Sequence, residues 1–421
     1  MSSFRIGGGI PLSGEVKIQG SKNAALPVMA ASILRGGITI LHGCPKIADV
    51  FLMQRLLEQL GCETHWEKNC FYIDSRNARN VSLQGGRTTA VSMRSSITLL
   101  GALLGRFGMC EMDYPGGCVI GARPIDMHIE AMSRMGAEFV MKDGSFLASA
   151  RRLHGADISL RLASVGVTEN ILLAAACAEG ETRIVRAAKE PEVDALCEYL
   201  RCLGCKIWIN ECDAKREIRI MPCEAARSVV EFTVPTDRIV AGTYLFACVG
   251  TGGTIYLKGA QKKQLDEPLR VIEQMGALTE SGEDGIFVKA PRTILARNIT
   301  TGVYPEFPTD LQSPAVAVLC HAQGDSLVQE TVFENRFRIV DELNRMGADI
   351  TVEGSSAVIH GGHWLRGNRV FARELRGGAA LVIAGLMAEG TTRIENVHYI
   401  ERGYENICRD LRDLGARISF E

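Results

Sequence analysis

A single cysteine lies in a glycine-rich stretch, Pro-Gly-Gly-Cys-Val-Ile-Gly-Ala-Arg-Pro, that runs from Pro115 to Pro124. Glycines let the backbone turn tightly and approach a ligand closely. Arg123, five residues after Cys118, can hold an anion and lower the pKa of a nearby thiol. A thiol in such surroundings can deliver a proton or attack an electrophile. The alternative is a buried structural cysteine, which is the usual role of this residue type.

The composition is that of an ordinary globular protein, with 46% hydrophobic and 23% charged residues in a chain of 421. This length suits two domains. A net charge of −2 argues against binding to nucleic acid or to an anionic membrane, because both need a basic face. The first residues lack the apolar core of a signal peptide, and no apolar run approaches membrane-spanning length. Fourteen cysteines in this context predict reduced thiols and a cytoplasmic location.

One short pattern, an apolar residue followed by glycine and then Ala or Cys, recurs along the whole chain about every 70 residues. Each copy follows a segment with helical apolar spacing and precedes a strand-like alternation. We therefore expect each glycine to end a helix and lead into a strand. The glycines are Gly61, Gly136, Gly204, Gly276, Gly347 and Gly415.

A second set of glycines lies upstream of the first, where a helix of small apolar residues ends and a strand follows. These are Gly37, Gly108, Gly180, Gly252, Gly324 and Gly390. Each unit therefore reads helix, strand, helix and, in most copies, a hairpin. Six units of this length are too long for a solenoid and predict two compact α/β domains of three units each.

The two ends of the chain complete this pattern. The N-terminal strands, 4–9 and 15–19, lack a preceding unit, and the last unit stops after one strand. The chain start is thus expected to complete the C-terminal domain. The predicted domains are residues 21–235 and residues 1–20 with 236–421, with a ligand-binding cleft between them.

The position 14 residues before each upstream glycine is the predicted start of an apolar helix. It holds Asn23, Arg94, Gly166, Arg238, Asp310 and Arg376. Helix N-termini attract phosphates and carboxylates. Simple capping explains one such residue, but arginine is a poor N-cap, so three arginines favour anion binding. In the second unit the spacing is longer, and the extra residues fall in the loop of Cys118, where function is commonly carried.

Several common sites are missing from the sequence. The pair Cys202 and Cys205 has no second Cys-x-x-Cys partner, so zinc is not expected. No phosphate-binding Gly-x-x-x-x-Gly-Lys loop and no Gly-x-Ser-x-Gly elbow occurs. The histidines are isolated from one another. No metal and no organic cofactor is therefore predicted.

Five longer motifs carry a specific resemblance that runs nearly from end to end. They are Gly-Ser-Lys-Asn-Ala-Ala at 20–25, the stretch 115–126, Phe-Pro-Thr-Asp at 307–310, Glu-Asn-Arg-Phe at 334–337 and Arg-Gly-Tyr-Glu at 402–405. The chain resembles the UDP-N-acetylglucosamine 1-carboxyvinyltransferase family, the enolpyruvyl transferases that open peptidoglycan precursor synthesis. The resemblance implies an inside-out α/β barrel fold with two domains, each made of three βαβαββ-type repeats.

The resemblance also implies the reaction, in which the enolpyruvyl group of phosphoenolpyruvate passes to the 3-hydroxyl of UDP-N-acetylglucosamine and phosphate is released. Both substrates are small molecules, and no nucleic acid, membrane or named protein partner is implied. A carbon of the enol must gain a proton while the sugar hydroxyl loses one. Cys118 is the candidate acid, and by resemblance it forms a phospholactoyl adduct and reacts with the epoxide fosfomycin. Asp310 is the candidate base or positioning group.

The remaining site residues are carried over from the same resemblance. The catalytic set is Cys118, Asp310, Lys22 and Arg402, with Glu374 and Arg376 in support. Phosphoenolpyruvate is expected on Lys22, Asn23, Arg123, Arg336 and Arg402. The UDP-sugar is expected along Asn23, Arg94, Arg123, Pro124, Ile125, Asp126, Met127, Ser164, Val165, Gly166, Asp310 and Val332.

Three positions depart from the family pattern. Glu374 stands where Asp is usual, Leu162 where a Lys often helps to hold the UDP, and Thr236 is an additional threonine at the expected hinge. These departures leave open a catalytically weakened paralogue that binds the UDP-sugar and regulates a partner. Transfer to shikimate 3-phosphate is a further alternative on the same fold, but that reaction has no need of a loop thiol.

Overall fold

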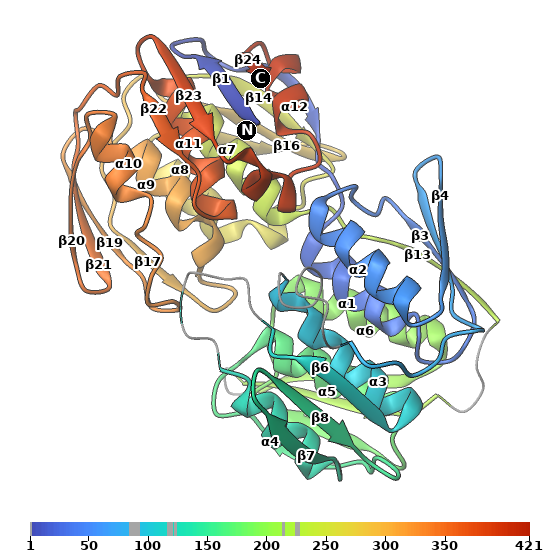
Figure 1. The fold of residues 1–421 in the computed structure, drawn as a ribbon. Helices are drawn as coiled ribbons and strands as arrows, with labels where there is room; N and C mark the ends of the chain where they lie inside the picture. Colours follow the sequence, from blue (N-terminus) through green and yellow to red (C-terminus); the bar gives the residue numbers. More distant parts are fainter. Residues whose placement is uncertain (1, 84–92, 116–120, 122–123, 213–214, 224–227) are drawn as a thin grey trace. The chain divides into compact units, whose positions relative to one another are not determined.

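The computed structural model describes residues 2–83, 93–115, 121, 124–212, 215–223 and 228–421 (Figure 1). The chain divides into two compact units. The first unit, called here the N-terminal unit, consists of residues 20–235 without the loop residues around 119–122. Residues 1–19 and 236–421 form the other, the C-terminal unit. The hydrophobic core is divided in the same way into two clusters.

The described part of the N-terminal unit contains three sheets. Their strand orders are β13(Val229–Thr233)-β3(Ile38–His42)-β5(Cys70–Asp74)-β4(Glu63–Glu67), β6(Met109–Asp113)-β8(Ser145–Ser149)-β7(Glu138–Lys142) and β11(Lys206–Cys212)-β12(Lys215–Met221)-β10(Thr182–Val185)-β9(Asp157–Ser159). Its helices are α1(Lys22–Ala31), α2(Ala48–Gln59), η1(Arg94–Thr98), α3(Leu99–Phe107), α4(Asp126–Arg134), α5(Val165–Ala175) and α6(Pro191–Leu203).

The described part of the C-terminal unit also contains three sheets. Their orders are β15(Leu278–Ser281)-β16(Gly285–Lys289)-β14(Thr254–Lys258)-β2(Ser13–Lys17), β18(Phe307–Pro308)-β17(Ile299–Gly302)-β19(Asp325–Gln329)-β21(Ser356–His360)-β20(Asp349–Glu353) and β22(Arg369–Phe371)-β23(Thr391–Glu395)-β1(Ser3–Gly7)-β24(Arg417–Phe420). Its helices are α7(Arg238–Thr251), η2(Lys262–Gln264), α8(Asp266–Gln274), η3(Thr309–Leu311), α9(Gln312–Leu319), α10(Val340–Arg345), α11(Leu375–Met387), η4(Val397–Arg402) and α12(Ile407–Asp413).

The N-terminal strands pair within the C-terminal unit. β1 lies antiparallel between β23 and β24, with Phe4 opposite Ile394 and Phe420, and β2 lies parallel to β14, with Val16 opposite Leu257. In the last repeat β24 therefore pairs with β1, where the other repeats place a hairpin. Chain segments that are distant in sequence are thus joined by main-chain hydrogen bonds.

The glycine repeat is confirmed in its main feature. The six downstream glycines all have positive φ, from 85° at Gly61 to 106° at Gly204, which is the conformation that ends a helix and that glycine adopts at little cost. The upstream glycines also have positive φ, except in the first repeat. There the left-handed residue is Gly36, with a φ of 63°, and not Gly37, because α1 ends at Ala31 and a run of turns continues to Gly36.

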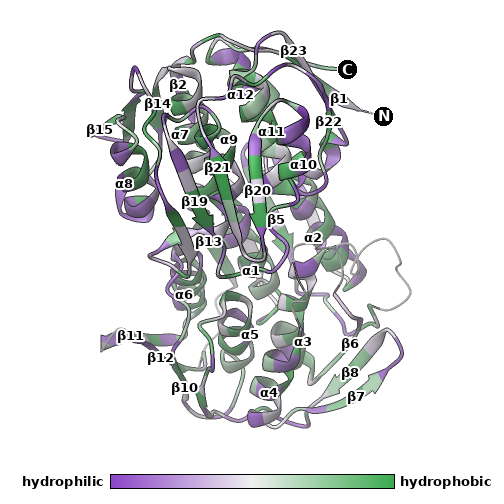
Figure 2. Ribbon diagram, turned by 90° about the vertical axis from the view of Figure 1, so that its left-hand side faces the viewer, coloured by the Kyte–Doolittle hydropathy of each residue, from purple (hydrophilic) through white to green (hydrophobic). Residues whose placement is uncertain are grey.

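The inner helices of each unit are buried on nearly all sides. In α5 every residue from Val167 to Ala175 is buried, and in α11 every residue from Arg376 to Met387. Their small side chains allow close helix packing, and α3 contacts α5 as α9 contacts α11. The sheets bury one face only, as the alternation of exposed and buried residues along β19 shows. The hydropathy of the residues in these strands and helices is shown in Figure 2. The predicted fold class, a two-domain α/β fold built from βαβαββ repeats, is confirmed.

The predicted helix starts are also confirmed. Asn23, Gly166 and Arg376 are each the second residue of their helix, α1, α5 and α11. Arg94 and Arg238 are the first residues of η1 and α7. Asp310 lies in η3, immediately before α9. The repeat therefore places these residues, five of them polar and one a glycine, at helix N-termini, one in each unit of the repeat.

The close packing of α3 on α5 gives a stability prediction. A Cβ on Gly101 would overlap the carbonyl oxygen of Asn170, whereas a Cβ on Gly105 in the same helix would lie 3.3 Å from Cys177 Cβ. Gly101→Ala forces two helix backbones apart, so we expect its melting temperature to fall by about 5 °C or more. Gly105→Ala is the matched control and should remain near the parent value by calorimetry. Equal melting temperatures for the two variants would contradict the packing argument.

Candidate active site

A carboxylate held between two arginines is the centre of the candidate site in the C-terminal unit. Arg376 Nη2 lies 3.0 Å from Asp310 Oδ2, and Arg336 Nη2 contacts Asp310 Oδ1. The side chains of Arg336 and Arg376 are only 2% and 4% exposed, while that of Asp310 is 28% exposed. Buried cations need a partner charge, so Asp310 fixes both guanidinium groups and remains partly open to solvent.

Glu374 supplies the second carboxylate of this cluster. Its side chain caps α11, accepting hydrogen bonds from the backbone N–H groups of Arg376, at 2.8 Å, and Gly377. Glu374 Oε2 also lies 3.8 Å from Arg336 Nη1. A carboxylate at a helix N-terminus is stabilised by the unpaired N–H groups and the helix dipole. Two arginines and two carboxylates therefore form one neutral cluster, and the departure from Asp at this position is compatible with capping.

A buried hydroxyl pair holds Arg376 from the other side. Tyr404 Oη lies 2.7 Å from Thr243 Oγ1, and Arg376 Nη1 donates to Tyr404 Oη at 3.5 Å. Burial raises the pKa of the Tyr404 hydroxyl, while the cationic Arg376 acts in the opposite direction. Burial by itself lowers the pKa of Arg376, but the charges of Asp310 and Asp237 and the contact with Tyr404 together raise it by more, so the net shift is upward. The guanidinium therefore stays charged in this buried position.

The loop before Arg336 is fixed by a third carboxylate. Glu330 Oε1 accepts from the backbone N–H groups of Val332, at 2.9 Å, and Phe333, at 3.1 Å. Thr309 Oγ1 donates to Glu330 Oε2 at 2.9 Å. The residue before Asp310 and the segment of Val332 are thus joined, which places two of the predicted UDP-sugar ligands on one connected frame.

Gln19 holds the segment around Arg402. Its side-chain amide donates to Gly403 O at 3.1 Å and accepts from Glu405 N at 2.7 Å. Arg402 is the last residue of η4 and is partly exposed. The Arg-Gly-Tyr-Glu motif thereby brings together a partly exposed arginine and the buried Tyr404.

In the N-terminal unit, Lys22 is the first residue of α1 and forms an ion pair with Asp49. Lys22 Nζ lies 2.6 Å from Asp49 Oδ2, and the side chains are 10% and 3% exposed. Ser21 caps the same helix by accepting from Ala24 N at 3.3 Å. Asn23 follows Lys22 and is partly exposed. The sequence did not indicate Asp49, because nothing in its spacing from Lys22 marks the two as neighbours.

Arg94 joins the two described flanks of the cysteine loop. Its guanidinium donates to Pro115 O at 3.1 Å and to Pro124 O at 3.3 Å. Cys118 and Arg123 lie outside the described residues, so the predictions for them remain predictions. Gly121, which groups with the C-terminal unit, lies against Glu334, since a Cβ there would overlap that carboxylate. Arg94 therefore fixes the distance between the ends of the loop.

The other predicted UDP-sugar ligands lie at the N-terminal ends of α4 and α5. Asp126 begins α4 and pairs with Arg161, Ile125 is buried, and Met127 is partly exposed. Ser164, Val165 and Gly166 begin α5 and are partly exposed. The two helix ends are tied together because Asn170 Nδ2 lies 3.0 Å from His128 Nδ1 and donates to Gly166 O at 3.3 Å.

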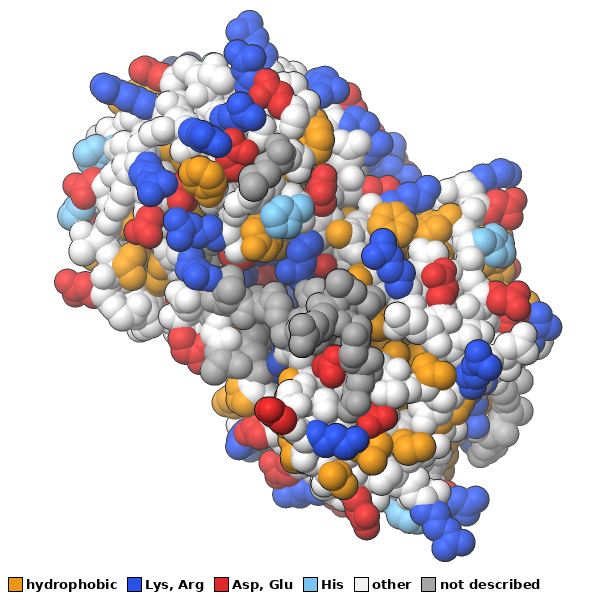
Figure 3. All heavy atoms as spheres, viewed as in Figure 1, with side chains coloured by type: hydrophobic (Ala, Val, Ile, Leu, Met, Phe, Trp, Pro, Cys, Tyr) orange, Lys and Arg blue, Asp and Glu red, His pale blue; other side chains and the backbone are white. Residues whose placement is uncertain are grey.

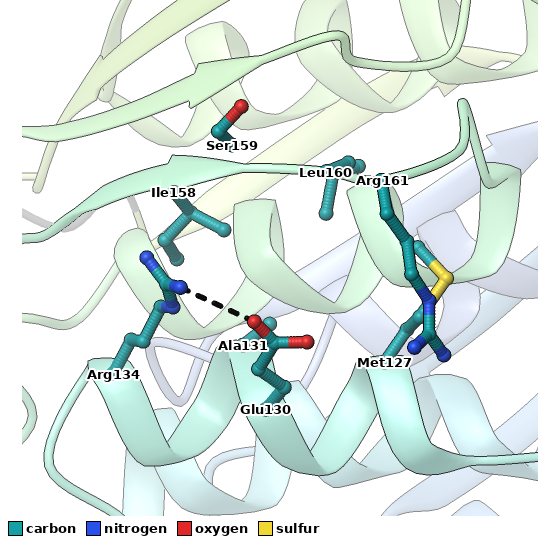
Figure 4. Close-up of a pocket in the computed structure, with 8 residues that line it drawn as sticks. All are labelled: Met127, Glu130, Ala131, Arg134, Ile158, Ser159, Leu160 and Arg161. Atoms are coloured by element: carbon teal, nitrogen blue, oxygen red, sulfur yellow. Dashed lines mark hydrogen bonds and ion pairs between the residues drawn. The ribbon is translucent and has the colours of Figure 1, made fainter.

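A small pocket lies between α4 and β9 with the two residues that follow this strand (Figure 4). Met127 and Arg161 are at one end of it, and the ion pair of Arg134 and Glu130, at 3.2 Å, is at the other. Leu162, one of the departures, is 67% exposed. It places an apolar side chain at the surface where the family often has a cation.

The third departure, Thr236, has a defined role in the C-terminal unit. Its hydroxyl donates to Gly259 O at 2.7 Å. The next residue, Asp237, caps α7 through hydrogen bonds from Ile239 N, at 2.9 Å, and Val240 N, at 3.0 Å. Thr236 therefore fits the entry of the chain into α7.

Charge on the surface is mixed. On the face shown in Figure 3, basic and acidic side chains are interspersed. Within the described ranges, no group of three or more His, Cys, Asp and Glu side chains is arranged to hold a metal ion. No helix among the described residues combines the length and the apolar character needed to cross a bilayer.

Comparison with known proteins places this chain in a class of enzymes. A family model described as EPSP synthase (3-phosphoshikimate 1-carboxyvinyltransferase) matches residues 6–411. The fold is shared with the enolpyruvyl transferase NikO from Streptomyces tendae, with a TM-score of 0.88 and 24% identity over 100% of this chain and 99% of that one. EPSP synthase from Acinetobacter baumannii gives a TM-score of 0.73 at 19% identity over 100% of both chains. The fold is that of the enolpyruvyl transferases.

Closer relatives define the family within this class. UDP-N-acetylglucosamine 1-carboxyvinyltransferase 2 of Caldanaerobacter subterraneus subsp. tengcongensis is 42% identical over 99% of both chains. UDP-N-acetylglucosamine 1-carboxyvinyltransferase of Campylobacter hominis is 43% identical, also over 99% of both chains. The chain belongs to the UDP-N-acetylglucosamine 1-carboxyvinyltransferase family, which confirms the resemblance seen in the sequence.

The double role of Glu374 gives a prediction. Glu374→Ala removes the cap of α11 and one of the two carboxylates that balance Arg336 and Arg376. We therefore expect the free energy of unfolding to fall by about 1–2 kcal/mol. Glu374→Asp keeps the charge and a capping oxygen, and its melting temperature should remain close to that of the parent. Thermal unfolding of the three proteins side by side tests this. Equal loss in both variants would show that the longer side chain, and not capping, is what the site requires.

Proposed function

We propose that this protein transfers the enolpyruvyl group of phosphoenolpyruvate to the 3-hydroxyl of UDP-N-acetylglucosamine and releases phosphate, an early step of peptidoglycan precursor synthesis. The observation that carries this proposal is the 39–43% identity, over nearly the whole chain, to relatives named for this activity. The cluster of Asp310, Arg336 and Arg376 supports it, since polyanionic substrates require cations fixed in place.

In this proposal each substrate is held by the residues that the family resemblance assigns to it. Phosphoenolpyruvate is held by Lys22, Asn23, Arg123, Arg336 and Arg402. The UDP-sugar is held by Asn23, Arg94, residues 123–127, residues 164–166, Asp310 and Val332. The N-termini of α1 and α5 add the positive ends of two helix dipoles, which favour phosphate. We also propose that the predicted domains, 21–235 and 1–20 with 236–421, are the folding units of the enzyme.

The chemistry requires one proton to leave the sugar hydroxyl and one to reach the enol carbon. The 3-hydroxyl oxygen forms a bond to the substituted carbon of phosphoenolpyruvate while the neighbouring methylene carbon gains a proton. The resulting methyl group then loses a proton as the bond to the phosphate oxygen breaks, which restores the double bond and releases phosphate. Cys118 is the proposed acid at carbon, because a thiol is still largely protonated near neutral pH, with a reference pKa of about 8.5. Asp310 is proposed as the base that accepts the proton of the hydroxyl or as the group that positions it. Its 28% exposure leaves lone pairs accessible beside the two arginines.

A cytoplasmic location is part of the proposal. Within the described residues no disulfide joins the cysteines, and reduced thiols are typical of that compartment.

Phosphate release from phosphoenolpyruvate tests the function. We expect release with UDP-N-acetylglucosamine, none with shikimate 3-phosphate, and inhibition by fosfomycin. Cys118→Ser should lower the rate by about 100-fold or more, because it removes the proposed acid. Release only with the shikimate compound would overturn the assignment. Binding of the UDP-sugar without turnover would favour a regulatory paralogue.

The hydroxyl pair behind Arg376 gives a second prediction. Tyr404→Phe removes the contact to Arg376, so Asp310 loses part of its support and kcat should fall by about tenfold with little change in KM. Tyr199→Phe is the matched control, because Tyr199 Oη lies 2.6 Å from Thr39 Oγ1 in an equally buried tyrosine–threonine pair. Each variant loses one buried hydrogen bond, which contributes about 1 kcal/mol to the free energy of unfolding. Equal kcat values would assign Tyr404 a structural role alone.

A further inference from the structure

The outer face of the sheet β13-β3-β5-β4 carries a chain of three reactive side chains. Cys70 Sγ lies 3.2 Å from His42 Nδ1, and His42 Nε2 lies 3.1 Å from Glu231 Oε2. All three residues belong to the N-terminal unit. The side chains of His42 and Glu231 are 41% and 65% exposed, and Cys70 is partly exposed. The group is therefore accessible from solvent.

The strand register produces this arrangement. His42 on β3 is directly opposite Cys70 on β5, and directly opposed side chains in a sheet lie within contact distance. Glu231 on β13 pairs with Ile40, two residues before His42, so it points to the same face and reaches His42 diagonally. Thr39 and Leu41 point to the buried face. The sheet therefore fixes the order thiol, imidazole, carboxylate.

The hydrogen bonds define which atom can accept a proton. A carboxylate only accepts hydrogen bonds, so His42 Nε2 carries a proton and donates it to Glu231. His42 Nδ1 is then unprotonated and accepts from the Cys70 thiol. Because the ring directs its two nitrogens at different partners, the three donors do not converge on a single point. The geometry is that of a proton relay and not of a metal chelate.

Other cysteines in the described part of the chain have different surroundings. Burial raises the pKa of the Cys62, Cys197 and Cys320 thiols to about 12, so these thiols are poor nucleophiles. Cys202 on α6 is partly exposed like Cys70, but it has no hydrogen-bond partner among the described residues. Cys202 therefore serves as the internal reference for a partly exposed thiol without a base.

We propose that Cys70 is a second nucleophilic thiol of this protein, with His42 as its proton acceptor and Glu231 as the group that orients the imidazole. The site takes small neutral or cationic disulfides. This inference is independent of the proposed transferase activity, because none of its three residues belongs to the proposed active site.

The step is a thiol–disulfide exchange. The Cys70 sulfur attacks one sulfur of the small disulfide, a new S–S bond forms, and the disulfide bond of the reagent breaks. His42 takes the thiol proton and passes it to the departing thiolate, so the small disulfide is the oxidant and one small thiol is released. Glu67 on β4 is directly opposite Cys70. Together with Glu231 it makes the surroundings acidic, which disfavours anionic disulfides.

The test uses the whole purified protein with cystamine, a dicationic disulfide, at neutral pH. Peptide mass spectrometry gives the rate of mixed-disulfide formation at each cysteine separately. We expect Cys70 to react at least about tenfold faster than Cys202, and His42→Asn to lower the Cys70 rate by about tenfold or more. Glu231→Gln should lower it by a smaller factor. Tyr72→Phe, on the same face of β5, is the matched control and should leave the rate unchanged.

Two controls keep the result interpretable. The Cys202 rate and the melting temperature are measured in every variant, because an effect on the fold would change them as well. 3,3′-Dithiodipropionate, a dianionic disulfide, should show a lower ratio of Cys70 to Cys202 modification than cystamine. A Cys70 rate that is unchanged in His42→Asn, or that does not exceed the Cys202 rate in the parent protein, would overturn the proposal.

Discussion

The buried ion pairs of Asp310 with Arg336 and Arg376 are the interaction on which the candidate active site depends. A guanidinium group that loses nearly all of its water is tolerated only when a carboxylate compensates its charge. Here one carboxylate serves two guanidinium groups, and Glu374 provides the second negative charge. Removing any one of the four leaves an uncompensated charge beside the others, which explains why these residues have to be considered together.

The neutrality of this cluster has a consequence for substrate binding. Arg336 and Arg376 are already balanced by Asp310 and Glu374, and Lys22 is balanced by Asp49. In the proposed function, a phosphate that binds Arg336 or Lys22 therefore shares that cation with a carboxylate of the protein. Helix N-termini add positive potential to such a site. A cation that is shared in this way is already held in place before the substrate binds. It therefore contributes more to orienting the substrate than to attracting it.

Much of the fold was predictable because the repeat is visible in the sequence. The glycine that ends each helix and the small residues of the inner helices recur in all six units, and the helix start is polar in five of them. Each feature has a local cause, since a left-handed residue favours glycine and close helix packing favours small side chains. The position of Gly36 was not predictable, because two adjacent glycines can each end the turn and the tertiary contacts select between them.

By itself, the sequence determined the family, the repeat, and the residue types of the site, because each of these depends on spacing along the chain. Only the tertiary structure decided which charges are paired. These contacts join residues from different elements. They are the pairs of Asp49 with Lys22 and of Tyr404 with Arg376, and the hydrogen-bonded series of Cys70, His42 and Glu231. No periodicity encodes such pairs, because they arise from strand register and from the packing of helices that are distant in the chain. The physical reason is that Coulomb and hydrogen-bond energies depend on distance in space, and that distance is fixed only when the chain folds.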